Sequence, residues 1–251
     1  MKNTHLNTVC WSTEINSEEA STAIQGSFTL WHDGTVDETE VVTVSETQLF
    51  LQINDCMPVN LICLNDHIQE LILGHMLTQG YIHGREDVEE LRCHRALAGD
   101  LHYQVLFRPH IPQVTIHRVL WKPEWIFALA RRFATDTPLY RRTHCVHSCL
   151  LAREDVILYQ CEDIGRHNAL DKAVGCALRD GVNRSECILY LSGRVPKDMM
   201  VKAINSGVGI VVSNSTATVQ AVELARENAI TLICSARPDH FDVMYNAILN
   251  G

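Results

Sequence analysis

The sequence predicts an α/β protein in which a layered α/β/α domain follows a smaller, β-rich α+β domain. From residue 138 onward, short apolar runs alternate with stretches of helical period, which is typical of a sheet covered by helices. Before residue 122, β-prone runs are separated by turn residues, which indicates a small antiparallel sheet. We therefore expect an arm over 1–26, the small domain over 27–121 and the layered domain over 122–251.

The first part of the chain is expected to hold the arm, the sheet and one helix. Residues 1–26 are rich in Ser, Thr, Asn and Glu with little apolar periodicity, so they predict a loosely held arm. Runs such as "EVVTVS" and "LFLQIN" predict the antiparallel sheet. The apolar spacing over 65–80 predicts a helix that Asn65 or Asp66 caps and Gly80 ends. Two further strands are predicted over 101–107 and 113–119.

The second part of the chain is expected to hold the larger sheet. A helix is predicted over 122–134, with Pro123 in its first turn and Ile126, Leu129 and Phe133 facing inward. Apolar strands are then predicted over 156–160, 187–192, 209–213 and 230–234.

Composition excludes several classes of partner and location. The formal charge of −9 would repel a phosphate polymer, so nucleic acid is not expected as a partner. No apolar run approaches the roughly 20 residues that span a bilayer, and the N-terminus lacks a secretory signal. We therefore expect a cytoplasmic protein without a membrane segment. The ten cysteines include no CxxC pair and are expected to be buried thiols, reactive thiols or metal ligands.

Polar residues follow each of the four strands of the predicted larger sheet. Gly193 would let a ligand approach the backbone, and small hydroxyls, free N–H groups and arginines would bind its phosphate oxygens. The carboxyl ends of buried strands collect such groups beside the N-termini of helices. The loops therefore predict a phosphate-bearing ligand, such as a nucleotide. The alternative is that the Ser, Asn and Thr residues only cap helices.

The stretch "CEDIGRHNALDKAVG" over 161–175 is the densest of these polar segments. A helix that begins near Arg166 would place His167 and Asp171 on one face. Arg166 could then bind an anion, while His167 exchanges a proton and Asp171 orients it. The alternative is a helix terminus with exposed ion pairs.

A second dense segment, "THCVHSC", covers residues 143–149. Alternate residues of a strand share a face, so Cys145, His147 and Cys149 could meet a zinc ion. Alternatively, one thiol could be activated by a neighbouring histidine. The third possibility is that the thiols are buried beside one functional histidine.

Several motifs, taken in order, resemble the formate dehydrogenase accessory sulfurtransferase family (FdhD). They are "EDIGRHNALDKAVG", "SGRVPKDMMVKA", "VVSNSTATVQAVELA" and "ITLICSAR". The resemblance extends upstream and covers nearly everything after the arm. It implies a cytidine-deaminase-like layered domain and a homodimer. Deaminase chemistry is not implied, because the HxE and PCxxC motifs of zinc deaminases are missing.

The resemblance also implies an activity. Members of the family take sulfur from a cysteine desulfurase and pass it to molybdenum bis(molybdopterin guanine dinucleotide), which is then inserted into formate dehydrogenase. The implied cofactor-binding positions are Arg166, His167, Ser192, Arg194, Ser213, Ser235, Ala236, Arg237, Pro238, Asp239 and His240. No structural metal is implied.

Two departures from the family pattern concern the chemistry. His147 matches the histidine of the family's TGGxH motif, but His144 and Cys145 replace its two glycines. His117 and Leu120 stand where most members carry the cysteines of a CGxCG loop. If sulfur transfer persists, Cys145 or Cys149 would carry the persulfide, with His147 nearby.

Three functions therefore follow from the sequence. The first is a sulfurtransferase with a relocated thiol. The second is a protein that binds and delivers the molybdenum cofactor without sulfur transfer. The third is a metal-dependent hydrolase that uses Cys145, His147 and Cys149.

Overall fold

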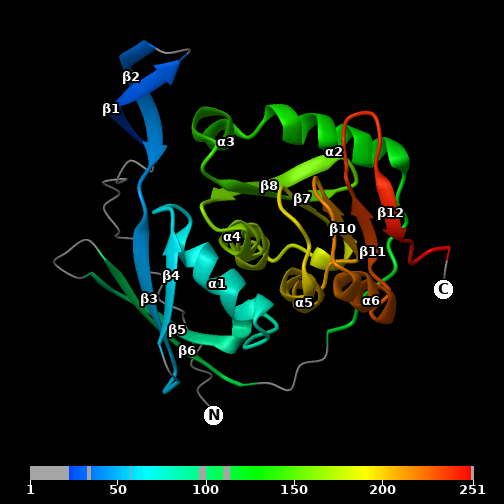
Figure 1. The fold of residues 1–251 in the computed structure, drawn as a ribbon. Helices are drawn as coiled ribbons and strands as arrows, with labels where there is room; N and C mark the ends of the chain where they lie inside the picture. Colours follow the sequence, from blue (N-terminus) through cyan, green and yellow to red (C-terminus); the bar gives the residue numbers. More distant parts are fainter. Residues whose placement is uncertain (1–22, 33–34, 57, 96–99, 110–113, 250–251) are drawn as a thin grey trace.

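The computed structural model describes residues 23–32, 35–56, 58–95, 100–109 and 114–249. Within these residues it contains three sheets and six α-helices (Figure 1). The mixed α/β class predicted from the sequence is confirmed. The likeness to cytidine deaminases and the domain boundaries stay predictions. Most of the predicted arm lies outside the described residues, and its last residues begin strand β1.

The first two sheets come from the N-terminal half of the chain. Strands β1 (Ala23–His32) and β2 (Thr35–Val44) form an antiparallel pair of their own. The four-stranded sheet has the order β4-β3-β6-β5. Its strands are β3 (Thr47–Ile53), β4 (Val59–Cys63), β5 (Val88–Arg95) and β6 (Leu101–Phe107), with a short 3-10 turn at Arg85–Asp87 before β5.

The predicted antiparallel sheet is confirmed only in part. β3 pairs antiparallel with β4, and β5 with β6, but β3 and β6 are parallel, so the four-stranded sheet is mixed. The run "EVVTVS" belongs to the separate β1–β2 pair, whereas β6 occupies the predicted range 101–107. No strand forms in the described part of 113–119, because residues 114–119 run as a loop against Gly209 instead of joining a ladder. Helix α1 (Ile68–Thr78) is preceded by His67 in a left-handed conformation (φ 48°). Asp66 does not cap this helix, because its carboxylate binds Lys172.

The third sheet has six strands in the order β12-β11-β10-β9-β7-β8. They are β7 (His147–Arg153), β8 (Val156–Asp163), β9 (Ile188–Leu191), β10 (Ile210–Ser213), β11 (Thr231–Cys234) and β12 (Asp242–Tyr245). β9, β10 and β11 are parallel, and β7 is antiparallel to both β8 and β9. All four strands predicted for this sheet are therefore present.

Helices cover both faces of the six-stranded sheet (Figure 1). On one face lies α2 (Pro123–Thr135), with Ile126, Leu129 and Phe133 buried as predicted. It is followed by the short α3 (Pro138–Thr143). On the other face lie α4 (Arg166–Arg179), α5 (Lys197–Ser206) and α6 (Val219–Glu227). A 3-10 turn at Arg184–Glu186 precedes β9.

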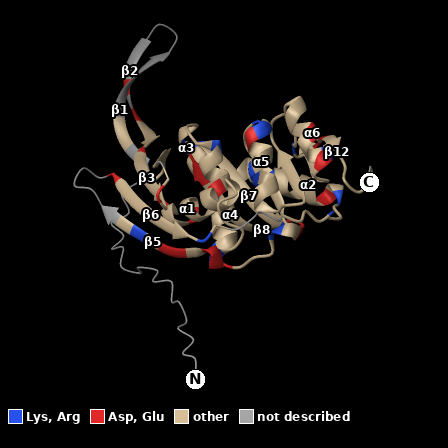
Figure 2. Cartoon of the chain, turned by 90° about the horizontal axis from the view of Figure 1, so that it is seen from below, with Lys and Arg blue, Asp and Glu red and all other residues tan. Residues whose placement is uncertain are grey.

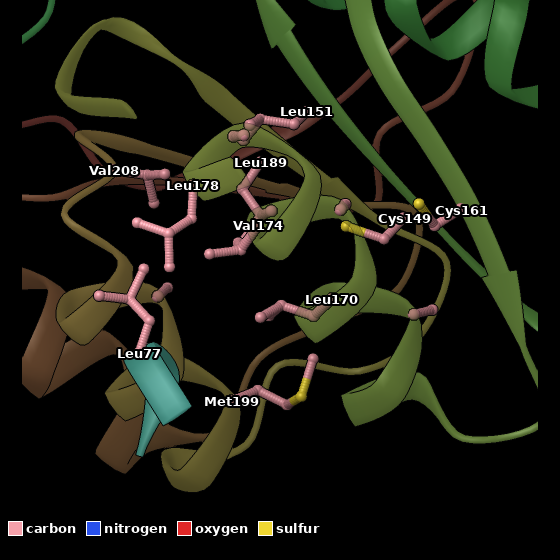
Figure 3. Close-up of a cluster of buried hydrophobic side chains, with 14 of the residues drawn as sticks. Leu77, Cys149, Leu151, Cys161, Leu170, Val174, Leu178, Leu189, Met199 and Val208 are labelled. Carbon is pink, nitrogen blue, oxygen red and sulfur yellow. The ribbon is translucent and has the colours of Figure 1, made fainter. Parts of the chain in front are cut away.

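Helix α1 joins the two larger sheets, because it lies between the four-stranded sheet and α4 (Figure 1). The two helices approach so closely that glycine is required at their crossing. A Cβ at Gly74 would lie 1.8 Å from the Asp171 carbonyl oxygen, and one at Gly175 would lie 1.8 Å from the Glu70 carbonyl oxygen. Buried side chains of both sheets form one contiguous cluster, part of which Figure 3 shows around α4.

Charged residues of both signs are interspersed along the chain, as on β5 in Figure 2. In the part of the chain that the structure describes, no helix is long and apolar enough to cross a membrane.

Candidate functional site

The polar loops predicted to carry the site meet where the carboxyl ends of β8 to β11 lie at one end of the six-stranded sheet, which is called the strand-end edge below. β8, β9, β10 and β11 all end at this edge, and β7 begins there. The strand register shows this directly, because His147 lies opposite Asp163, and Leu191 pairs with both Cys149 and Ser213. The convergence expected from the sequence is therefore present in the fold.

Hydrogen bonds link these loops from strand to strand. The Ser213 hydroxyl donates to the Gly193 carbonyl oxygen at 2.8 Å, and the Asn214 N–H donates to the Leu191 carbonyl oxygen at 2.8 Å. Arg237, in the loop after β11, binds oxygens of Asn214. The edge is therefore a connected set of loops and not a group of independent caps.

A pocket of about 370 Å³ opens at this edge, beside α2 and α3. Its polar lining includes Arg141, His144, Cys145, His147, Ser192 and Asn214. The structure thus brings together two segments that the sequence analysis treated separately, "THCVHSC" and the loop after β9. The helix α3 that contributes Arg141 was not predicted, although Pro138 at its first turn is a typical start signal.

His147 is held in the pocket as a neutral imidazole. Its Nδ1 lies 3.1 Å from the Ser192 hydroxyl, which accepts a hydrogen bond from the Ser148 N–H at 3.1 Å. Burial, together with the positive charge of Arg166, lowers the pKa of His147. If the Ser192 hydroxyl donates to Nδ1, the ring proton is on Nε2, from which it can be donated to a ligand.

Arg166 has an unpartnered polar atom next to this histidine. It is the first residue of α4, and its Cδ lies 3.3 Å from the position that a Cβ on Gly193 would occupy. Its Nε is buried, and within the described chain it has no hydrogen-bond partner. Buried donors nearly always have a partner, and the N-terminus of a helix favours negative charge. An anion bound beside His147 would supply the missing acceptor.

The two acids before α4 shape the site from opposite faces of β8. The Glu162 carboxylate accepts hydrogen bonds from the N–H groups of Leu139 at 2.9 Å and Tyr140 at 3.0 Å. It thereby holds the start of α3, whose end leads into His144 and Cys145. The carboxylate of Asp163 points to the opposite face of β8, toward the start of α4. The two acids therefore position different elements around the pocket.

Asp163 is fully buried and holds the start of α4. It accepts hydrogen bonds from the Gly165 N–H at 3.0 Å and from the Asn168 side chain at 2.9 Å. Lys172 Nζ lies 2.7 Å from its other oxygen, which also accepts the Leu64 N–H at 3.0 Å. The β8–α4 turn that presents Arg166 is therefore fixed by a paired, buried carboxylate.

The predicted partnership of His167 with Asp171 is wrong. The two residues share one face of α4 as expected, but that face meets α5, which places a separate partner opposite each one. His167 Nε2 lies 3.3 Å from Asp198, whereas Asp171 binds Lys202 Nζ at 2.6 Å. The Asp171 carboxylate also contacts Thr78 and His75 on α1, at 2.7 and 3.2 Å. Asp171 therefore belongs to the interior, and His167 is not oriented by it.

The two candidate thiols lie in opposite environments. Cys145 is exposed and lines the pocket. Cys149 is fully buried against α4, next to Cys161 (Figure 3), and burial strongly raises the pKa of its thiol. A buried thiol with a raised pKa is a poor nucleophile, so the geometry favours Cys145.

The zinc site that the sequence left open as an alternative has no support in the described residues. In the described part of the chain, no three His, Cys, Asp or Glu side chains are grouped to hold a metal ion. Cys149 points into the apolar core, while the Nδ1 atom of His147 is engaged by Ser192. A metal-dependent hydrolase built on Cys145, His147 and Cys149 therefore lacks its site.

The remaining cofactor-binding predictions fall at different places on the edge. Ser213 is buried and bonded to Gly193, so it links loops. Ser235 has a left-handed backbone (φ 51°), and Ala236 is buried with its carbonyl oxygen bonded to the Tyr190 hydroxyl. The exposed positions are Arg194, Arg237, Pro238, Asp239 and His240, of which Asp239 and His240 pair at 2.8 Å. Their role in binding a ligand stays a prediction.

His117 and Leu120 lie at the other end of the six-stranded sheet, and both are exposed. They border a surface that also includes Ile188 and Ile210, the first residues of β9 and β10. The positions that replace the cysteines are thus separated from Cys145 by the length of these strands.

Comparisons with known proteins agree with this fold and with the motifs. Sulfur carrier protein FdhD of Listeria monocytogenes serotype 4b is 26% identical over 239 residues, which cover 84% of this chain and 92% of that protein. Its namesake in Bacillus subtilis strain 168 is 26% identical over 241 residues, covering 85% and 92%. Over 82 residues, 33% of this chain and 36% of the other, Protein FdhD of Methanocaldococcus jannaschii is 51% identical.

A solved structure and a family model give the same result. The crystal structure of "a putative formate dehydrogenase accessory protein" from Desulfotalea psychrophila matches with a TM-score of 0.74 and 26% identity, covering 88% of this chain and 96% of that one. The FdhD/NarQ family model matches residues 104–247, more than half of the sequence. The chain therefore belongs to the FdhD/NarQ family.

Proposed function

We propose that this protein is an accessory factor for the maturation of formate dehydrogenase. In this proposal it binds molybdenum bis(molybdopterin guanine dinucleotide) as a substrate at the strand-end edge and passes sulfur to it from a cysteine desulfurase. The names of the relatives, sulfur carrier protein and formate dehydrogenase accessory protein, support the pathway. The observation that carries the site is the buried Arg166 Nε without a partner in the described chain, next to the pocket that exposes Cys145.

The chemistry of the edge suits a ligand with phosphate groups. Arg166 offers a guanidinium at the N-terminus of α4, and Arg141 adds a second one to the pocket lining. Guanidinium groups bind phosphate oxygens through paired N–H donors. A neutral His147 with its proton on Nε2 would donate to the same ligand without adding charge. Together these groups favour the anionic part of a guanine dinucleotide.

Sulfur transfer in this chain would use Cys145. Its thiolate would attack the terminal sulfur of a desulfurase cysteine persulfide, forming a new S–S bond as the old one breaks. The desulfurase cysteine leaves as a thiolate, and Cys145 then carries the persulfide. Arg141 and the neighbouring histidines lie where they would favour a negative sulfur.

The test of the transfer is intact-mass spectrometry after incubation with a cysteine desulfurase and cysteine. We expect a gain of one sulfur atom that a reductant reverses and that Cys145→Ser abolishes. The matched controls are Cys56→Ser and Cys93→Ser, because both thiols are exposed and neither lines the pocket. A gain that survives in Cys145→Ser would remove Cys145 from the proposal.

A second candidate function is binding and delivery of the cofactor without transfer. It is favoured by His117 and Leu120 at the positions of the family's cysteines. Guanosine diphosphate binding that Arg166→Met weakens, combined with no sulfur gain on any cysteine, would select this candidate. Cytoplasmic location and a homodimer stay predictions, and sedimentation of the purified chain tests the latter.

A further inference from the structure

A second cavity, of about 300 Å³, lies at the opposite edge of the six-stranded sheet. It is formed by the end of α5, by the 3-10 turn before β9, by His83 in the segment after α1, and by Val114, Thr115 and His117. It shares no lining residue with the strand-end pocket. Whatever it binds is therefore independent of the function proposed above.

Arg184 supplies a positive charge to this cavity without an acidic partner. Its Nε donates to the Ser206 carbonyl oxygen at 2.9 Å, and its Nη2 makes a long contact of 3.5 Å with the His83 carbonyl oxygen. In the described residues it forms no ion pair, and its Nη1 donates to no protein acceptor. Burial lowers the pKa of Arg184, against the raising effects of Cys187 and Glu86. A partly buried cation without an ion-pair partner favours an anionic ligand.

His83, which lines the same cavity, has an unsatisfied ring nitrogen. Its Nε2 is buried and has no hydrogen-bond partner in the part of the chain described. Its main-chain N–H is already used, because it donates to Asp87 at 2.7 Å. The imidazole lines the cavity together with Arg184. The buried His83 Nε2 and the partly bonded Arg184 guanidinium thus belong to two residues that line one cavity.

The other groups around the cavity do not compete for these donors. The last carbonyl of α5, which would repel an anion, is already bonded to Arg184 Nε. The Asn183 side chain is engaged with Ser185, and Ser206 donates its hydroxyl to Ala203. Asn205 donates to the Thr78 carbonyl oxygen, and Thr115 and His117 complete the polar lining. Among the described lining residues, Arg184 is the one lysine or arginine.

We propose that this cavity is a binding site for a phosphate group, held by the Arg184 guanidinium and by His83 Nε2. A guanidinium binds two oxygens of one anion, and an imidazole N–H then requires a third oxygen. A tetrahedral phosphate has this third oxygen, whereas a carboxylate does not. The phosphate source is either free phosphate or the monoester of a small metabolite, since the cavity is too small for a dinucleotide.

Titration of the full-length protein with inorganic phosphate, followed by calorimetry, tests the site. We expect saturable binding to one site, weakened about tenfold or more by Arg184→Met and several-fold by His83→Ala. The matched control is Arg226→Met, which removes an exposed arginine of α6 outside this cavity and should leave the affinity unchanged. Tighter binding of ribose 5-phosphate than of phosphate would identify a monoester, and equal or weaker binding would identify free phosphate.

The variants are chosen so that loss of folding cannot imitate loss of binding. Arg184→Met also removes the hydrogen bond to Ser206 at the end of α5, so this variant can lose stability. His83→Ala keeps that hydrogen bond. If Arg184→Met unfolds, the phosphate affinity of His83→Ala decides the proposal. The proposal is overturned by the absence of saturable binding to the wild type, by unchanged affinity in His83→Ala, or by acetate binding as tightly as phosphate. Loss of phosphate binding in Arg166→Met would place the anion at the strand-end edge and would also overturn it.

Discussion

The strand-end edge and the seam between α1, α4 and α5 are built from the same short segment, yet they leave their polar groups in opposite states. At the edge, Arg166 has a buried nitrogen without an acceptor in the described chain, and Cys145 is open to solvent. In the seam, buried Asp171 is surrounded by Lys202, Thr78 and His75. The comparison teaches that a dense polar sequence contains both ligand-binding and structural groups, and that the partners supplied by other elements separate them.

The largest effect should come from breaking the seam. Asp171→Ala leaves Lys202 buried without its counter-charge, and we expect a loss of about 3–5 kcal/mol in the free energy of unfolding. Urea denaturation measures this loss. Asp198→Ala is the control, because Asp198 is 61% exposed beside His167 and should cost about 1 kcal/mol or less. Equal losses in the two variants would mean that the buried Asp171–Lys202 pair contributes no more to stability than an exposed contact.

A second change tests the close approach of the helices that enclose the seam. Gly175→Ala would place a methyl group against the Glu70 carbonyl oxygen, so α1 and α4 must move apart. We expect a loss of about 1–3 kcal/mol, measured by thermal and urea unfolding. Gly74→Ala should behave alike, because it meets the Asp171 carbonyl oxygen from the other helix. An unchanged unfolding midpoint in both variants would contradict the geometry.

The two regions should also lose stability at different pH. The pKa of His147 is lowered by burial and Arg166, so its contribution is present above about pH 6.5 and is lost as pH falls through the lowered value. The pKa of Asp171 is lowered chiefly by Lys202 against the opposing effect of burial, so its contribution persists above about pH 3.9 and is lost at still lower pH. Urea midpoints measured against pH should show a small step followed by a larger one. His147→Gln should reduce the first step, and a profile unaltered by it would count against this assignment.

The smallest effect on stability is expected at the edge itself. Arg166→Met removes a group that lacks a partner in the described chain, so the free energy of unfolding should change by about 0.5 kcal/mol or less. The same variant should raise the pKa of His147, because the positive charge of Arg166 lowers it. Nuclear magnetic resonance titration of the histidine measures this, with Arg194→Met as the control. If Arg166→Met were strongly destabilised while the pKa of His147 stayed the same, Arg166 would have a structural role and not a ligand-binding one.

The sequence was informative where local pattern determines structure. The helix over 122–134 and the strands of the six-stranded sheet were predicted because apolar spacing alone specifies them. The convergence of polar loops followed from strand direction. The strand over 113–119 failed because a β-prone run needs a neighbouring strand to pair with, and this one runs beside Gly209.

The site residues were harder to predict because their roles depend on partners distant in sequence. Asp66 matched a helix cap but binds Lys172, and Asp171 matched an orienting acid but binds Lys202. Cys149 has histidines nearby in sequence, yet its strand turns it into the core. Sequence spacing gives the face on which a side chain lies, but not the residue that meets it there.

The two adjacent acids of β8 have a consequence for how this family member can change. Glu162 anchors α3 on one face of the strand, and Asp163 anchors the start of α4 on the other. Because neighbouring strand residues point to opposite faces, a slip of one residue would exchange the two anchors. It would release both α3, which lines the pocket, and the turn that carries Arg166. A residue inserted in the β7–β8 turn, at Glu154 and Asp155, would leave the pocket intact only if β8 kept its present register with β7. The register of β8 therefore determines both anchors together. A family member that keeps this register keeps both, and one that shifts it by a residue loses both.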